Sequence, residues 1–427
     1  MHTRTWTLVL VVAACGSPSG GDGAESSDTS VGEATSGSPT TTDATTTAPT
    51  STTTASTSTT TTVDDTGSDS GDESSSSDTG HTVTPCDALG EPGAWEHITP
   101  GEVDLAQDFV TPAGENYGVH SFVIDPQDTA TVYLGTSAQG IWKTSDCGAT
   151  WVHIDTGTNA ETIDGGRQWT FAIDFEDPQV LYTNTGYGAF GAWKSTNGGV
   201  DWDPLVDDEH LAVLQFGGFV QYIRMDETNP QHLLVTPHFE CEVGALDGLP
   251  ATPNCMLETM DAGATWTILE GTPPAGEGVT QRMLDADTWF WAEGFGGLWR
   301  TGNGGASWEH VYDEGYATAA VFGLPSGGYV TGGVFSTLRS DDGIAWTSIA
   351  DSPGTEFFAG DDETIYASRN GYYSSASTAD PTTWTDLPMP DFPSPDYIVT
   401  WDLQYDRDHR ILYSLNSRNG FWRLRVQ

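Results

Sequence analysis

Short apolar runs alternate with polar positions over most of the chain beyond residue 93. The stretches "HSFVIDPQDTATVYLGTSAQGIWKT" (120–144) and "WTFAIDFEDPQVLYTNTGYGAFGAWKS" (169–195) each predict a strand, an acidic turn, a strand, a glycine-rich loop and a strand. "YIRMDETNPQHLLVTP" (222–237) repeats the first part of this pattern. No long stretch has the 3.6-residue spacing of a helix. The pattern therefore predicts an all-β protein built from repeated four-stranded units.

A second repeat follows each of these units. It is seen in "TSDCGATW" (144–151), "STNGGVDW" (195–202), "TMDAGATW" (259–266) and "TGNGGASW" (301–308), with a shorter "SDDGIAW" (340–346) and a degenerate "STADPTTW" (377–384). Asp or Asn accepts backbone hydrogen bonds within a tight turn, Gly adopts a positive φ, and Trp packs a large ring into the sheet. The pattern resembles the Asp-box (BNR) repeat of β-propellers, and the resemblance covers most of residues 93–427.

The number of blades follows from the tryptophans that end these repeats. They lie at positions 151, 202, 266, 308, 346 and 384, which indicates six complete blades. The segment 396–426 supplies three further strands, and "GAWEHI" (93–98) resembles "ATWVHI" (149–154). Trp95 is therefore expected at the seventh box position, in an N-terminal strand that closes the ring. We predict a single seven-bladed propeller, with a six-bladed ring as the alternative.

The N-terminal region has a different character. "WTLVLVVAA" (6–14) is too short to span a bilayer, and "VAAC" (12–15) resembles the lipobox of bacterial lipoproteins. We expect residues 1–14 to be a signal peptide and Cys15 to be lipidated, which would anchor an exported protein to the bacterial cell envelope; a plain secretory signal is the alternative. Of residues 16–85, 37 are Ser or Thr, so 15–86 should be a disordered linker before the propeller at 87–427.

The charge of the chain limits its partners. There are 14 Lys+Arg and 61 Asp+Glu, a net charge of −47, and the 50 acids and 13 bases of residues 87–427 still give −37. Such a surface repels nucleic acid and anionic lipid headgroups. We expect a monomer that meets the membrane only through its N-terminal lipid.

The cysteines predict two disulfides. Apart from Cys15, the chain has Cys86, Cys147, Cys241 and Cys255, and an even number in an exported protein favours bridges. A bridge between Cys241 and Cys255 would close an insertion in the third blade. A bridge between Cys86 and Cys147 would lock the ring where it closes. No Cys-x-x-Cys is present, so neither a metal nor a cofactor is expected.

Aromatic residues gather in the loops expected to surround the channel mouth. We predict that Trp169, Tyr187, Phe190, Phe295, Tyr117 and Arg167 contact a ligand, with Asp164 and Glu293 as hydrogen-bonding or catalytic carboxylates. Exposed rings beside carboxylates suit sugars, although the same rings could instead pack the loops together. Because Arg167 is the only Lys or Arg in these loops, a neutral or cationic ligand is favoured.

The resemblance implies several activities. The repeat units are similar to those of xyloglucanase-type glycoside hydrolases, and "IDGG" (163–166) is similar to an acidic loop of that family, which implies a role for Asp164. Sialidases need three arginines, for which Arg167, Arg224 and Arg282 are available, but their Arg-Ile-Pro signature is missing. Sortilin-like and photosystem assembly-factor-like propellers bind polypeptides. We therefore expect a surface-tethered propeller that binds a glycan or a protein; the alternative is a glycoside hydrolase with paired carboxylates.

Overall fold

The structure is a computed structural model, and it describes a large part of the chain. The described residues are 86, 89–106, 117–214, 218–238, 255–273, 280–292, 296–313, 317–318, 320–333 and 335–427. Several predictions therefore fall outside the described residues, namely the signal peptide, Cys15, the linker up to residue 85, Cys241, Glu293, Phe295 and the side chain of Cys255.

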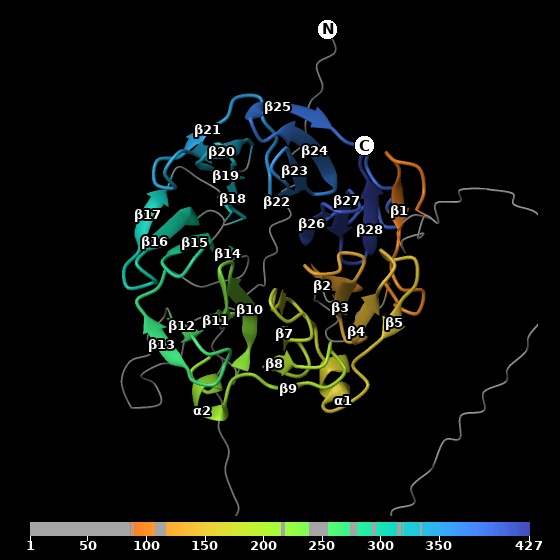
Figure 1. The fold of residues 1–427 in the computed structure, drawn as a ribbon, viewed down its shortest axis with the longest axis vertical. Coiled ribbons are helices and arrows are strands. Elements are labelled where there is room, and N and C mark those ends of the chain that lie inside the picture. The colour runs from red at the N-terminus through yellow and green to blue at the C-terminus, as the bar shows by residue number, and fades with distance from the viewer. Residues whose placement is uncertain are drawn as a thin grey trace, which may run out of the picture. The chain divides into compact units, whose positions relative to one another are not determined.

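The described strands form seven antiparallel sheets of four strands each, arranged as a ring (Figure 1). The first three blades comprise β2 (Val119–Ile124), β3 (Val132–Thr136), β4 (Ile141–Thr144), β5 (Val152–His153); β6 (Phe171–Ile173), β7 (Leu181–Thr185), β8 (Gly191–Ser195), β9 (Asp203–Pro204); and β10 (Val220–Asp226), β11 (Asn229–Pro237), β12 (Cys255–Thr259), β13 (Thr267–Glu270). The next three comprise β14 (Thr280–Met283), β15 (Thr288–Ala292), β16 (Leu298–Gly302), β17 (Glu309–Tyr312); β18 (Phe322–Gly323), β19 (Tyr329–Gly332), β20 (Thr337–Ser340), β21 (Thr347–Ser348); and β22 (Phe357–Gly360), β23 (Thr364–Arg369), β24 (Tyr372–Ser377), β25 (Asp380–Asp386).

The seventh blade combines both ends of the folded region. It comprises β26 (Asp402–Asp406), β27 (Ile411–Leu415), β28 (Phe421–Arg425) and β1 (Trp95–His97). β1 pairs antiparallel with β28, with Trp95 opposite Leu424, and the Trp95 indole donates to the Pro388 carbonyl at 2.7 Å. The seven-bladed prediction with N-terminal closure is confirmed, and the six-bladed alternative is wrong. Closure leaves no free sheet edge where the ring's ends meet.

The Asp-box turns have the expected hydrogen bonds. In the first blade, Asp146 accepts from the Thr144 hydroxyl at 2.7 Å and from the Thr150 amide at 2.8 Å, while the Thr144 hydroxyl accepts from the Gly148 amide at 2.9 Å. Cys147 and Gly148 both have positive φ, 57° and 88°. The repeat therefore recurs because the first five blades use the same turn between their third and fourth strands.

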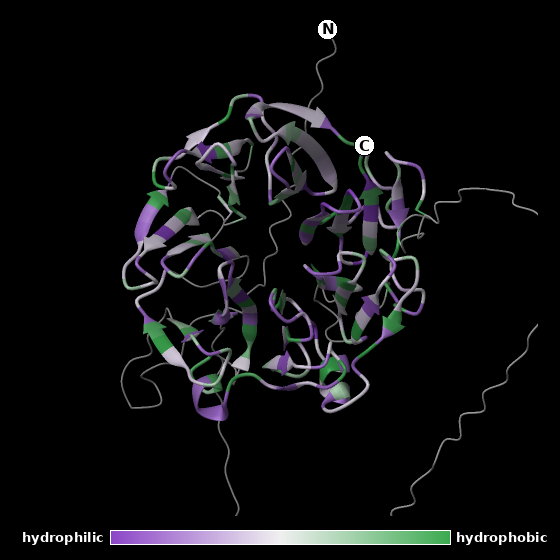
Figure 2. Ribbon diagram, viewed as in Figure 1, coloured by the Kyte–Doolittle hydropathy of each residue, from purple (hydrophilic) through white to green (hydrophobic). Residues whose placement is uncertain are grey.

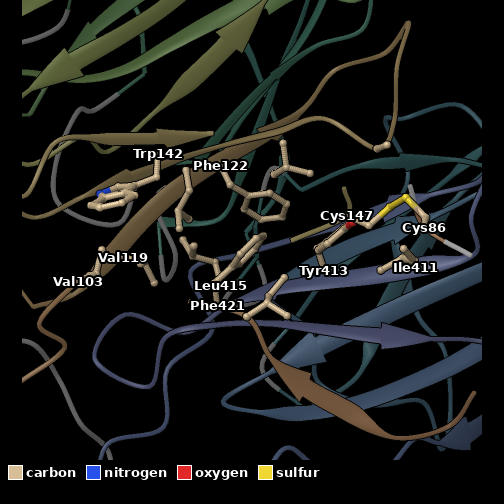
Figure 3. Close-up of a cluster of buried hydrophobic side chains, with 14 residues drawn as sticks. Cys86, Val103, Val119, Phe122, Trp142, Cys147, Ile411, Tyr413, Leu415 and Phe421 are labelled. Atoms are coloured by element: carbon tan, nitrogen blue, oxygen red, sulfur yellow. A yellow bond between two sulfur atoms is a disulfide. The ribbon is translucent and has the colours of Figure 1, made fainter. Parts of the chain in front are cut away.

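The hydrophobic core lies between blades. Among the described residues, the buried apolar side chains form seven clusters, and each draws on two neighbouring blades. Figure 2 shows the matching mixture of hydrophobic and hydrophilic residues along the strands. The cluster between blades seven and one brings Phe122 against Phe421 and Tyr413 (Figure 3). Because each sheet buries both faces against its neighbours, stability depends on completing the ring.

One of the two predicted disulfides is confirmed. Cys86 and Cys147 are bonded, with their Cα atoms 5.6 Å apart, at the edge of the cluster shown in Figure 3. The bridge joins the segment before β1 to the Asp-box turn of blade one. The Cys241–Cys255 bridge stays a prediction, because Cys241 lies outside the described residues.

Two short helices lie in the connections between blades. They are α1 (Ala160–Asp164) and α2 (Asp208–Leu211), which are too short to show helical periodicity in the sequence. Over the ranges that the structure describes, no helix has the length and apolarity needed to cross a membrane. α1 matters for the site, because it carries Asp164 and lies three residues before Arg167.

Candidate functional site

The loops that enter each innermost strand and those that join the second and third strands lie at the same end of a blade. In blade two, this relation is fixed by backbone hydrogen bonds. The Arg167 amide donates to Gly186 at 2.7 Å, and the Gly186 amide donates to Arg167 at 3.0 Å. This pairing brings the segment before β6 and the β7–β8 loop together. It places Trp169 and Tyr187 side by side.

Five rings from blades two and three form what we call the aromatic cluster: Trp169, Tyr187, Phe190, Phe219 and His238. Trp169 meets Tyr187 edge to face at 5.4 Å and stacks on Phe219 at 5.5 Å. Phe219 also contacts Phe190 at 4.8 Å and His238 at 4.4 Å. Three of the predicted ligand-binding rings are therefore brought together by the fold.

The aromatic cluster is buried at its base and accessible at its rim. Phe219 is only 4% exposed, whereas Phe190 is 41% exposed. Trp169 and Tyr187 are half-buried. The rings thus pack the loops together, as the sequence allowed, and also present apolar surface to solvent.

Arg167 lies beneath these rings. It is 4% exposed, and its guanidinium carbon lies 4.5 Å from the ring centre of Trp169, 5.2 Å from Trp401 and 5.8 Å from Tyr187. Such cation–π contacts stabilise a desolvated guanidinium. Burial, with a smaller contribution from the Arg167 charge, lowers the pKa of His238 to about 3. His238 is therefore neutral at physiological pH, and Arg167 supplies the positive charge of this cluster.

Blade seven contributes side chains that the sequence analysis missed. These side chains are Trp401 and Arg418. Arg418 lies over the rings of Tyr117 at 5.2 Å and Tyr397 at 4.8 Å. Tyr117 therefore contacts the blade-seven loop, and its predicted ligand role stays a prediction.

The three arginines available for a sialidase-like site do not converge. Arg224 donates to the Gln281 carbonyl at 3.1 Å and to the Thr170 hydroxyl at 3.2 Å. Arg282 pairs with Glu227 at 2.6 Å. Glu227 follows the end of β10 opposite to the end that carries Phe219 and the aromatic cluster. Arg282 is thus held near the far face, away from Arg167.

Asp164 belongs to a different cluster from Trp169. Its Oδ1 lies 3.0 Å from Nε2 of His153, and the same Nε2 lies 2.9 Å from Oδ1 of Asp155. Asp155 has no exposed side-chain surface, and burial together with the nearby Asp164 charge raises its pKa to about 8. The sequence analysis singled out Asp164 but not His153 or Asp155. The "HID" spacing at 153–155 was the available signal.

Comparison with known proteins supports the fold. No protein-family model matches the sequence. A xyloglucanase, Xgh74A of Acetivibrio thermocellus, is 29% identical over 124 residues, which is 26% of this chain and 14% of the xyloglucanase. The chain thus matches only a small part of that enzyme's length.

Solved propellers superpose over most of the chain. YCF48 from Cyanidioschyzon merolae has a TM-score of 0.52 at 11% identity and covers 78% of this chain and 98% of its own. A structure of YCF48 bound to D1 peptide has a TM-score of 0.53 at 13% identity and covers 80% and 99%. The protein is therefore a seven-bladed Asp-box propeller related in fold to these proteins.

Proposed function

We propose that the propeller is a binding module whose glycan or protein ligand rests on the aromatic cluster. The observation that carries this proposal is the exposure of that cluster. Trp169 and Tyr187 are half-buried and Phe190 is 41% exposed, so part of the apolar surface of these rings faces solvent. Planar rings held rigid by their neighbours offer contact area at low entropic cost.

The ligand chemistry follows from the surroundings of the rings. Arg167 is covered by Trp169, Tyr187 and Trp401, so it supports the rings from below rather than meeting a ligand directly. Residues 87–427 as a whole are strongly acidic, with a net charge of −37. A neutral or cationic ligand is therefore favoured over an anionic one. The binding of D1 peptide by YCF48, a neighbour in fold, is consistent with a polypeptide ligand.

Glycoside hydrolysis is the second candidate, and the xyloglucanase match supports it. Hydrolysis needs two carboxylates that both reach the sugar, about 5–5.5 Å or 6.5–9.5 Å apart. Asp155 cannot serve as the partner of Asp164, because its side chain has no exposed surface. Glu293, the partner predicted from the sequence, lies outside the described residues. The binding role therefore has the stronger support.

The test uses the full chain on arrays of neutral glycans and peptides. Trp169→Ala should weaken binding of the best array ligand by about 1–3 kcal/mol, roughly 5- to 150-fold; because Trp169 also packs on Tyr187 and Phe219, the variant should melt at a lower temperature but still unfold in one cooperative transition. Tyr372→Ala is the matched control, because Tyr372 is a 64% exposed aromatic in blade six, outside the cluster. Equal losses for both variants, or none for Trp169→Ala, would refute the aromatic cluster as the site.

Release of reducing sugar, measured in parallel on the same glycans, separates the two candidates. A binding module releases none. Turnover that Asp164→Asn abolishes while binding persists would instead establish a hydrolase. The exported, lipid-anchored placement suggested by residues 1–15 supports a ligand outside the cytoplasm and remains part of the proposal.

A further inference from the structure

A histidine placed over a glycine recurs in three blades. In blade one, His153 packs on Trp142 with ring centres 5.2 Å apart, and a Cβ on Gly140 would collide with its Nε2. In blade seven, His97 packs on Trp422 at 4.8 Å, and a Cβ on Gly420 would collide with its Nε2 in the same way. Blade four repeats the arrangement with its own Gly, Trp and His, at positions 297, 299 and 310. The histidine and glycine are thus a shared structural device.

Blade one differs in what surrounds the imidazole. The residue two positions after the histidine is Asp155 in blade one, Thr99 in blade seven and Tyr312 in blade four. α1 then adds Asp164 from the connection to blade two. The ligand atoms of His153, Asp155 and Asp164 all lie within 4.8 Å of one another. A Cβ on Gly140 would also lie 2.9 Å from Asp155 Oδ1 and collide with Asp164 Oδ1, so all three groups converge above this glycine.

The hydrogen bonds among His153, Asp155 and Asp164 do not satisfy all of their polar atoms. An imidazole Nε2 carries either one proton or one lone pair, so it cannot donate fully to two carboxylates. Asp155 accepts from the Ile141 amide through Oδ1 at 2.8 Å, but its buried Oδ2 has no hydrogen-bond partner. A carboxylate with no exposed surface and an unpaired oxygen is costly beside a second carboxylate.

We propose that His153 Nε2 and the carboxylates of Asp155 and Asp164 bind one divalent first-row transition-metal cation such as Mn²⁺ or Zn²⁺. Metal bonds of about 2.1 Å place neighbouring ligand atoms about 3.0 Å apart in octahedral geometry, which is usual for Mn²⁺, and about 3.4 Å apart in the tetrahedral geometry of Zn²⁺. The observed separations from Nε2 are 2.9 and 3.0 Å. Imidazole with carboxylates suits these cations better than Ca²⁺ or Mg²⁺.

A cation can reach this site from solvent, and once bound it would restrain the neighbouring chain. His153 and Asp164 are 32% and 41% exposed, so a cation can enter from solvent, while Asp155 forms the buried floor. The cation would tie α1 to the end of β5. Because α1 leads directly to Arg167 and Trp169, the bound metal would also fix the segment that carries the aromatic cluster. The metal site itself does not depend on the proposed ligand.

The test is equilibrium dialysis of the full, EDTA-treated chain against MnCl₂ and ZnCl₂ in 0.15 M NaCl, with bound metal counted by elemental analysis. Wild type should retain one saturable equivalent and melt at a higher temperature with metal. His153→Gln and Asp164→Asn should each weaken that equivalent by tenfold or more. The dialysis against MnCl₂ distinguishes the proposed site from metal binding by the thiol of Cys15, because thiolates prefer softer cations than Mn²⁺.

His97→Gln is the matched control, since His97 has the same packing in blade seven but its Nε2 pairs with the Thr99 hydroxyl at 2.8 Å, where His153 meets two carboxylates. It should bind metal like wild type. Asp155→Thr, which copies blade seven, should abolish binding; if it does not fold, the half-exposed Asp164→Asn still decides. The proposal is overturned if wild type shows no saturable equivalent. It is equally overturned if neither His153→Gln nor Asp164→Asn weakens metal binding. A loss of metal binding in His97→Gln as large as that in His153→Gln would also overturn it.

Discussion

At the scale of single residues, the charge state of a buried histidine follows from its nearest neighbours. Burial and the Arg167 charge lower the pKa values of His120 and His238, which favours their neutral forms. His232 has the opposite environment. Burial alone would lower its pKa, but hydrogen bonds to Glu258 and Asp226, at 3.1 and 3.0 Å, outweigh burial and raise it. The environment thus favours the neutral form of histidine in one blade and the charged form in another.

This contrast predicts a pH dependence of stability. Because the folded pKa of His232 is raised above its unfolded value of 6.5, its contribution is complete below pH 6.5 and is lost as pH rises through the folded pKa. His232→Gln should cost about 1.5–3 kcal/mol at pH 6, the range for hydrogen bonds to charged groups, and less at pH 9. Urea unfolding at both pH values measures the difference. His210→Gln, at a more exposed pair, should change little; a cost for His232→Gln that is the same at both pH values would contradict the assignment.

Prediction of single residues from the sequence succeeded where the repeated four-stranded unit determines which loops lie side by side. Trp169 and Tyr187 could be placed together because the unit predicts that the segment before an innermost strand lies beside the loop between the second and third strands. The His153 cluster could not be predicted. It depends on the rotation of α1, a five-residue helix with no periodic signal, and on the burial of Asp155 beneath it. Asp164 was expected to line the ligand groove together with Glu293, which lies outside the described residues; the side chain of Asp164 contacts His153 and lies near Asp155.

At the scale of elements, removing β1 measures how much its pairing with β28 contributes to the closure of the ring. Deleting residues 87–98 removes Trp95 and leaves β28 as a free edge. It also removes the ring contact between Trp95 and Tyr373, 4.6 Å between centres. The domain should lose about 3 kcal/mol or more, since loss of a buried Trp alone costs about 3–5 kcal/mol. Thermal unfolding followed by tryptophan fluorescence measures the loss.

A deletion of equal length, residues 51–62 in the Ser/Thr-rich segment, is the control and should leave the melting temperature unchanged. If both deletions melt alike, the closing strand contributes nothing. The repeat made this element predictable, because "GAWEHI" matches "ATWVHI" in a chain whose last blade lacks one strand. The lengths of the strands were harder to predict, because the packing of neighbouring blades decides where strand pairing ends. The strands β5, β9, β18 and β21 have only two residues each.

At the scale of the whole molecule, the ring has one seam, and it lies within blade seven, between β28 and β1. Arg423 in β28 crosses it, because it pairs with Glu96 at 2.7 Å and donates to the Cys147 carbonyl at 2.5 Å. On the N-terminal side of the seam, the Trp151 indole donates to the Ile98 carbonyl at 2.7 Å, and the Cys86–Cys147 bridge joins the segment before β1 to blade one. Side-chain contacts and a disulfide therefore hold the N-terminal segment in place where it completes the last blade.

Removal of that disulfide should weaken the whole ring rather than one blade. Because the bridge spans 61 residues, the chain-entropy relation gives a loss of about 4 kcal/mol for Cys86→Ala/Cys147→Ala. Alanine suits the turn, since Ala262 has the equivalent position in blade three with φ of 55°. Wild type in dithiothreitol should lose at least as much stability as the double variant lacks, and any further loss that dithiothreitol causes in the double variant would report the predicted Cys241–Cys255 bridge. Since each blade packs on two others, fluorescence and far-ultraviolet circular dichroism should report one common transition. A double variant as stable as the oxidised wild type would show that the hydrogen bonds of Trp151 and Arg423 already close the seam.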